Sequence, residues 1–78
     1  METINKKILK IFINFLKIKK NKKKKELTQK KIKNWDSLNH VILLLAIQEE
    51  FKIKFKISEY LKLNSFENIV KTIKSKKS

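Results

Sequence analysis

The absence of glycine, proline and cysteine constrains this chain more than any residue it contains, because none of its 78 residues is of these three types. Without glycine or proline, the chain is poorly suited to tight β-hairpins, glycine-rich phosphate loops and polyproline segments. Without cysteine it can form no disulfide, thiolate metal site or cysteine nucleophile. Its single histidine also excludes a histidine-rich metal site. The sequence therefore predicts a small all-α domain with one modest core.

Positive charge dominates the chain but spares one window. All 21 basic residues are lysine, and the formal net charge at pH 7 is +14. Residues 35–51 hold no lysine and three acids, Asp36, Glu49 and Glu50. The excess lysine has two interpretations: a codon bias toward Lys, Ile and Asn, or a basic surface for nucleic acid or anionic lipid. The absence of arginine, which suits bidentate nucleic-acid contacts best, favours the codon bias.

An apolar stripe predicts the first helix at about residues 2–18. Its members recur at steps of three and four residues, and they are Ile4, Ile8, Ile11, Phe12, Phe15 and Ile18. Lysines interrupt this segment, so we expect neither a signal peptide nor a stable membrane insertion. The lysine-rich residues 19–35 are expected to be a solvated loop, pinned to the core by Leu27 and Ile32.

The lysine-free window predicts a second helix at about residues 37–51. Asp36 and Ser37 are good helix starters, because their side-chain oxygens accept hydrogen bonds from backbone N–H groups that are unpaired at a helix N-terminus. One stripe of this helix comprises Leu43, Ile47 and Phe51. A second comprises Val41, Leu45 and Gln48, with Ile42 beside it. A helix that is apolar over most of its girth either lies in a core or exposes part of itself to a partner.

The end of the chain predicts two more helices after a short connection. The segment KIKFKI alternates lysine with apolar residues, and we expect it to insert Ile53 and Phe55 into the core as an extended stretch. The pattern leaves open whether Ile57 joins them. A short helix is predicted at about residues 58–62, capped by Ser58, and a last helix at about 65–76, capped by Ser65.

This order of helices, with the segments WDSLNHVILLLAIQEEFKIKF and SFENIVKTI, resembles the acyl carrier proteins. In that family an Asp-Ser-Leu motif opens the second helix, which ends in a Glu-Glu-x-Phe type element followed by an Ile-x-Phe/Ile stretch. The resemblance covers residues 35–73 and extends to residues 1–34 only by general layout. It implies a single carrier domain over residues 1–78, folded as a small four-helix bundle with three longer helices and one short one.

The resemblance also implies a covalent prosthetic group. Ser37 would carry 4′-phosphopantetheine through a phosphodiester on its Oγ, added by a phosphopantetheinyl transferase that Asp36 helps to recruit. The thiol at the end of the arm would hold an acyl or related cargo as a thioester. A chain without cysteine needs such a thiol from outside. The carrier would present its cargo to acyl-transferring or acyl-loading enzymes, with the pathway, fatty-acid synthesis or another, left open.

The resemblance assigns partner binding to the second helix. Its docking residues would be Leu38, Val41, Ile42, Leu45, Glu49 and Glu50. The acids would steer encounter with basic partners, and the apolar residues would supply most of the buried area. This hypothesis explains why the window from residue 35 to residue 51 holds no lysine. A monomeric, cytoplasmic protein that binds no nucleic acid is expected.

Two other functional classes and one structural alternative stay open. The chain could be a small basic helical protein that binds nucleic acid, or a membrane-surface protein that works through residues 4–20. Ser37 could also be an ordinary capping residue. We expect His40 to be exposed polar surface and Trp35 to pack the loop against the bundle. The sequence shows no catalytic constellation and no metal site, so an enzyme is not expected.

Overall fold

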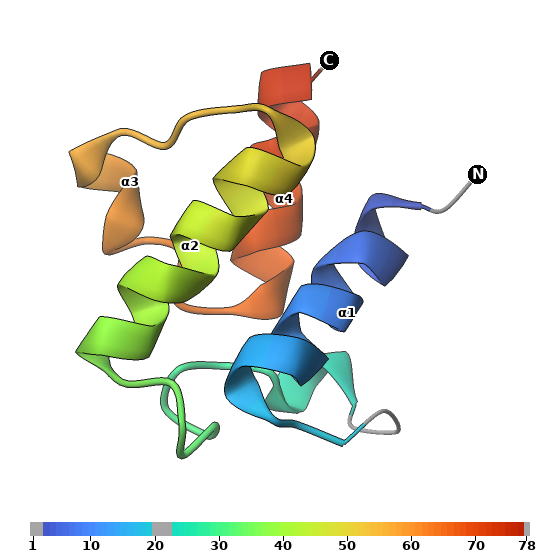
Figure 1. The fold of residues 1–78 in the computed structure, drawn as a ribbon, viewed down its shortest axis with the longest axis vertical. Helices are drawn as coiled ribbons and strands as arrows, with labels where there is room; N and C mark the ends of the chain where they lie inside the picture. The colour runs from blue at the N-terminus through green and yellow to red at the C-terminus, as the bar shows by residue number, and fades with distance from the viewer. Residues whose placement is uncertain (1–2, 20–22, 78) are drawn as a thin grey trace.

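The computed structural model describes residues 3–19 and 23–77, in which four α-helices and one short 3-10 helix surround a single core. In chain order the elements are α1 (Ile4–Leu16), η1 (Lys24–Glu26), α2 (Ser37–Phe51), α3 (Ile57–Tyr60) and α4 (Phe66–Lys77). α1 packs against both α2 and α4, while the short α3 stands at the edge of the molecule, on the far side of α2 from α1 (Figure 1). The described residues contain no β-strand, so the predicted all-α class is confirmed for them.

The predicted helix positions agree with the structure to within two residues, with one wrong cap. α2 has the predicted bounds, whereas α1 ends two residues early, and its predicted start at residue 2 lies outside the described residues. The short helix α3 begins at Ile57 with Lys56 at the N-cap position, so Ser58 lies inside the helix rather than before it. Ser65 does cap α4, because its Oγ accepts a hydrogen bond from the backbone N–H of Asn68 at 3.1 Å.

Two helices end on a lysine in the left-handed conformation, which is usually taken by glycine. Lys17 follows α1 with φ of 56°, and Lys52 follows α2 with φ of 53°. The backbone N–H of each lysine donates to the carbonyl four residues earlier, Ile13 and Gln48 respectively. The chain has no glycine, so lysine occupies both positions. The left-handed conformation costs lysine some free energy, because its Cβ approaches the following carbonyl oxygen.

The core is built around Phe12 of α1. Its ring meets Trp35 at 5.2 Å between centroids and 82°, and Phe66 of α4 at 5.4 Å and 80°. Both are edge-to-face contacts, the arrangement that aromatic rings favour. Trp35 is only 2% exposed, so the expectation that it packs the loop against the bundle is confirmed.

The long loop is pinned where the sequence predicts. Leu27 and Ile32 are both buried in the core. The backbone N–H of Phe66 donates to the Leu27 carbonyl at 2.8 Å, and that of Gln29 donates to the Asn64 carbonyl at 2.9 Å. These bonds hold the loop against the start of α4 and the connection before it.

One residue of the predicted apolar stripe of α1 lies outside the core, and the connection after α2 largely follows its pattern. Phe15 was expected on the core stripe of α1 but is 41% exposed, and the neighbouring Leu16 is buried in its place. After α2, Phe55 is buried and Ile53 packs against the core, as predicted. Ile57, which the pattern left open, is 89% exposed. The alternation therefore ends where α3 begins.

Candidate functional site

Ser37 is the first residue of α2, and its side chain is not used to build the helix. Asp36 occupies the N-cap position, where its Oδ1 accepts a hydrogen bond from the backbone N–H of Asn39 at 2.8 Å. Ser37 is exposed, and no residue within the described ranges is hydrogen-bonded to its Oγ. The capping role that could have explained a serine here belongs to Asp36. The hydroxyl therefore lies open to solvent at the positive end of the α2 dipole.

A chain of amide hydrogen bonds ties the first turn of α2 to the end of α1. The side chain of Asn34 donates from Nδ2 to the carbonyl of Leu16 at 3.1 Å. The carbonyl of Asn34 in turn accepts from Nδ2 of Asn39 at 2.7 Å. The two bonds hold the start of α2, which includes Ser37, against the C-terminal end of α1.

His40 ties the same turn to α3, and the expectation that it is exposed is wrong. The ring is 9% exposed, and its Nδ1 accepts a hydrogen bond from the indole Nε1 of Trp35 at 2.8 Å. Its Nε2 lies 2.8 Å from the backbone carbonyl of Tyr60. An indole nitrogen can only donate and a carbonyl can only accept, so His40 is the neutral tautomer with its proton on Nε2. Both ring nitrogens are thus engaged in positioning, and neither is available to a reaction.

The outward side of α2 carries four exposed aliphatic side chains, named here the α2 patch: Leu38, Val41, Ile42 and Leu45. Their exposed fractions run from 38% for Ile42 to 69% for Leu38. Spacings of three, four and seven residues place them on one side of the helix. The opposite side supplies Leu43, Leu44, Ile47 and Phe51 to the core. The structure therefore brings together the four apolar residues for which the sequence predicted partner binding.

The acids predicted to flank the patch separate into two positions. Glu49 follows Leu45 by four residues, so it continues the line of the α2 patch at its C-terminal end and is exposed. Glu50 is exposed as well, but it lies 100° further around the helix, where it lines a shallow hollow with Lys7 and Lys52. Asp36 is exposed at the other end of α2. Of the three acids, Asp36 and Glu49 mark the two ends of the helix that carries the patch.

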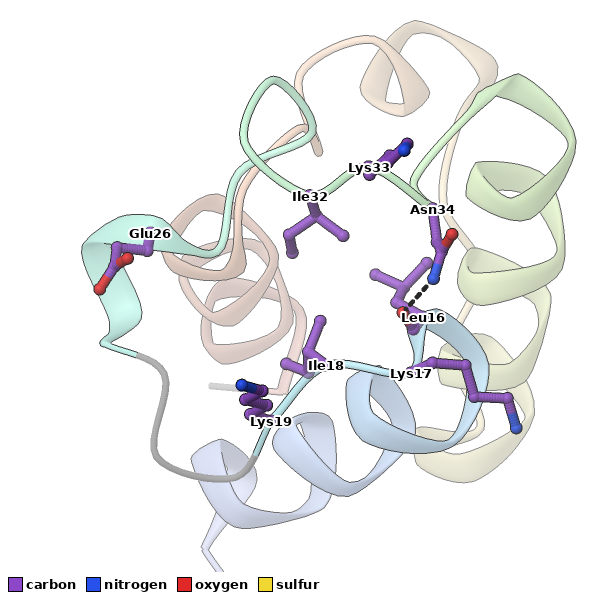
Figure 2. Close-up of a pocket in the computed structure, with 8 residues that line it drawn as sticks. All are labelled: Leu16, Lys17, Ile18, Lys19, Glu26, Ile32, Lys33 and Asn34. Carbon is purple, nitrogen blue, oxygen red and sulfur yellow. Dashed lines mark hydrogen bonds between the residues drawn. The ribbon is translucent and has the colours of Figure 1, made fainter.

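A hollow of about 500 Å³ lies where α1 ends, beside the loop that leads to Ser37 (Figure 2). In Figure 2, Ile18 and Ile32 point toward each other across it, while Lys17 and Lys33 extend away. Its one acid, Glu26, stands apart from the lysines in the same view. Because no pair of reactive groups converges there, the hollow offers no catalytic arrangement.

Glu59 in α3 is the one acid whose ionisation the fold clearly perturbs among the residues described. Its Oε1 accepts from the backbone N–H of Lys56 at 2.7 Å and lies 3.0 Å from the Lys76 ammonium. The backbone hydrogen bond from Lys56, followed by the bond from Lys76, lowers the pKa of the Glu59 carboxyl below its usual value. This perturbation belongs to a salt bridge between α3 and α4 and lies apart from Ser37.

The described ranges contain no group of three His, Asp or Glu side chains that could hold a metal ion. No helix in them has both the length and the apolar character needed to cross a bilayer. Comparison with known protein families and with curated proteins found no match to the chain. The chemistry of the site must therefore be argued from its own residues.

The sequence singled out Ser37, Asp36 and the α2 patch, but it did not predict the hydrogen bonds that Asn34, Asn39 and His40 form around the first turn of α2. Local spacing gives a weak signal for Asn39, since amide side chains often bond near a helix start. No local signal points to His40, because one of its two partners comes from Tyr60, twenty residues further along the chain.

Proposed function

We propose that the chain is an acyl carrier protein, which carries an acyl or related group as a thioester on 4′-phosphopantetheine attached to Ser37. One observation supports this above all others. Ser37 stands at the first position of α2 with an exposed and uncommitted hydroxyl, because the neighbouring Asp36 supplies the cap. This serine is neither buried nor used as a cap, and the start of the helix does not depend on its hydroxyl. It is therefore available to a modifying enzyme.

The residues around Ser37 suit a phosphodiester. The first backbone N–H groups of a helix lack partners within it, and the helix dipole places partial positive charge there, so a phosphate at this position is stabilised. Asp36 accepts a hydrogen bond from the backbone N–H of Asn39. The backbone N–H groups of Ser37 and Leu38, at the very start of α2, would then be available to the phosphate. The prosthetic group would supply the thiol that the chain lacks, and every other chemical step would belong to partner enzymes.

The hydrogen bonds around the first turn support a carrier that presents Ser37 in one defined position. Asn34 joins this turn to the carbonyl of Leu16 in α1, and His40 joins it to the carbonyl of Tyr60 in α3. A partner enzyme would then meet a preformed surface and lose little conformational entropy on binding.

The α2 patch suits the docking of such enzymes. Its aliphatic side chains would be buried against an apolar surface of the partner, and Asp36 and Glu49 would pair with basic residues at the two ends. The transferase and the acyl-loading enzymes would use the same patch in turn, since each must approach the helix that begins at Ser37.

Co-expression with a phosphopantetheinyl transferase, followed by intact mass spectrometry, tests the proposal. The wild-type chain should gain the mass of one phosphopantetheine. Ser37→Ala should abolish the gain, while the matched variant Ser58→Ala, which removes another exposed helical serine, should retain it. Both variants should keep the far-UV circular dichroism of the wild type, because neither hydroxyl is part of the core.

Two outcomes would count against the proposal. The first is a wild-type chain that gains no mass with any of several transferases of different specificity. The second is a gain that persists in Ser37→Ala, which would place the modification on another hydroxyl.

A further inference from the structure

We propose that α3 is a contact site for the surface of an anionic lipid bilayer, through Ile57 and Leu61 and the lysines around them. This proposal is independent of the carrier function. Ile57 is 89% exposed and Leu61 is 86% exposed, the highest values among the large apolar side chains described. They are four residues apart, so they lie on one side of α3 and its last turn. We name the two side chains the α3 tip.

The exposure of the α3 tip follows from how α3 is anchored. α3 itself contributes no buried residue to the core. It is held instead by Phe55 before it and Leu63 after it, both buried, and by Tyr60, which packs partly against the core. With those three side chains directed inward, Ile57 and Leu61 are left on the outside of the helix.

The charges around the α3 tip are positive. Lys54, Lys56 and Lys62 are all exposed and flank the two aliphatic residues in the chain. The acid of the same segment, Glu59, is paired with Lys76 at 3.0 Å and so adds little negative charge to this surface. The α2 patch has the opposite character, because it lies on a lysine-free helix with an acid at each end. The two apolar surfaces therefore suit partners of opposite charge.

An anionic bilayer fits the α3 tip better than a protein does. Two side chains expose a few hundred Å² at most, whereas a stable protein interface buries about 800 Å² on each partner. A bilayer needs no matching groove, because aliphatic side chains enter the headgroup region while nearby lysines pair with anionic lipids. Nucleic acid fits less well, since aliphatic side chains neither stack on bases nor read their edges.

The position of α3 in the fold allows such a contact without unfolding. α3 stands at the edge of the molecule, away from α1 (Figure 1). By contrast, the apolar stripe of α1 is buried, so a membrane contact through that stripe would require α1 to leave the core. The Tyr60 carbonyl of α3 accepts from His40 in the first turn of α2, so a lipid-bound α3 would hold the α2 end that bears Ser37 close to the headgroups.

Vesicle binding tests the proposal with the full chain. The probes are sedimentable vesicles of phosphatidylcholine alone and of phosphatidylcholine mixed with phosphatidylglycerol. The wild type should bind the mixed vesicles reversibly and the neutral ones far less, and added salt should weaken binding. The triple variant Lys54→Gln, Lys56→Gln and Lys62→Gln should lower the partition coefficient about 100-fold, since each lysine near an anionic surface contributes about fivefold.

Two further variants separate a site on α3 from a general effect of net charge. Ile57→Ser with Leu61→Ser keeps every charge and should lower the partition coefficient at least tenfold. The charge-matched control, Lys6→Gln, Lys10→Gln and Lys17→Gln on α1, removes three exposed lysines far from α3 and should lower it less than about tenfold. Circular dichroism should be unchanged in all of them, because none of the replaced side chains is buried.

Three results would overturn the proposal: equal binding to neutral and mixed vesicles, equal loss in the α1 and α3 lysine variants, or full binding after the Ile57 and Leu61 replacements. A purified acidic protein or a DNA duplex that binds the chain through the α3 tip, under conditions where the mixed vesicles do not, would also overturn it.

Discussion

α1 and α2 are neighbours of similar length that pack on the same core, yet their outward surfaces differ. Lys6, Lys10 and Lys17 lie along one exposed side of α1, opposite its buried stripe. α2 has no lysine, and its outward side exposes the four aliphatic residues of the α2 patch. Lysine keeps a helix soluble without affecting the core, whereas exposed aliphatic side chains add nothing to the core and favour association.

Folding explains the outward surface of α1 but not that of α2. The surface of α1 is accounted for by a solvated helix in a lysine-rich chain. The surface of α2 is more apolar than the fold needs, since its buried residues, among them Leu43, Leu44 and Ile47, already fill its share of the core. We therefore take the α2 patch as the strongest indication of a partner.

The largest expected effect tests whether α2 has two distinct sides. Leu44 and Leu45 are adjacent in the chain, but Leu44 is fully buried and Leu45 is 56% exposed. Leu44→Ala should lower the free energy of unfolding by about 2–5 kcal/mol through lost burial and a cavity. Leu45→Ala should change it by less than about 0.5 kcal/mol. Urea denaturation followed by circular dichroism measures both, and a comparable loss for Leu45→Ala would show that the α2 patch belongs to the core.

The next effect concerns the support of the first turn of α2. His40→Ala removes the acceptor for the Trp35 indole and the donor to the Tyr60 carbonyl, leaving a buried N–H group and a partly buried carbonyl without these partners. We expect a loss of about 1–3 kcal/mol in the free energy of unfolding. The matched variant Asn14→Ala replaces an exposed polar residue of α1 and should cost less than about 0.5 kcal/mol.

The Nε1–H resonance of the Trp35 indole gives a separate measure of its hydrogen bond to His40. It should shift in His40→Ala and stay in place in Asn14→Ala. If the resonance did not move, the hydrogen bond between Trp35 and His40 would not form in solution, and the Tyr60 carbonyl would be the partner that remains for His40.

The sequence predicted those features that local chemistry determines. The start of α2 follows from Asp36 as a cap, and the helix class follows from a chain without glycine or proline. The burial of Leu27 and Ile32 follows from their isolation in a lysine-rich loop, since little else there can be buried. In each case the prediction depends on the residue types of one short segment.

The sequence did not predict the burial or exposure of residues whose contacts come from distant parts of the chain. The buried ring of His40 is bonded to the Trp35 indole at Nδ1 and to the Tyr60 carbonyl at Nε2, an arrangement that no spacing reveals. Leu16 is buried in place of Phe15 because the packing around the end of α1 favours one of two adjacent apolar residues. The exposure of Ile57 depends on where the extended stretch gives way to α3. Periodicity specifies a stripe, but tertiary packing chooses its members.

A smaller effect tests which acids of α2 belong to the proposed docking surface. Glu49→Lys reverses a charge on the line of the α2 patch, whereas Glu50→Lys reverses one beside Lys7 and Lys52. If a basic partner docks on the patch, Glu49→Lys should lower kcat/KM for phosphopantetheinylation about tenfold at low salt, and Glu50→Lys less than about threefold. Added salt should reduce the difference. Equal effects would show that only the net charge matters.

The smallest effect contrasts an acid that the fold uses with one that it does not. The pKa of Glu59 is lowered in the folded state by the backbone N–H of Lys56 and by Lys76, so its ionised form favours folding. This contribution is present at neutral pH and is lost as the pH falls through the lowered pKa. It should stay below about 1 kcal/mol, because the pair is partly exposed. Glu59→Gln should therefore flatten the acid side of the stability profile in urea titrations.

The α2 variant Glu49→Gln should leave that profile unchanged, since none of the described residues forms a salt bridge or hydrogen bond with the Glu49 carboxylate. A profile that flattened equally in both variants would mean that the acids of α2 serve the fold, and the contrast with α1 would then lose its functional meaning.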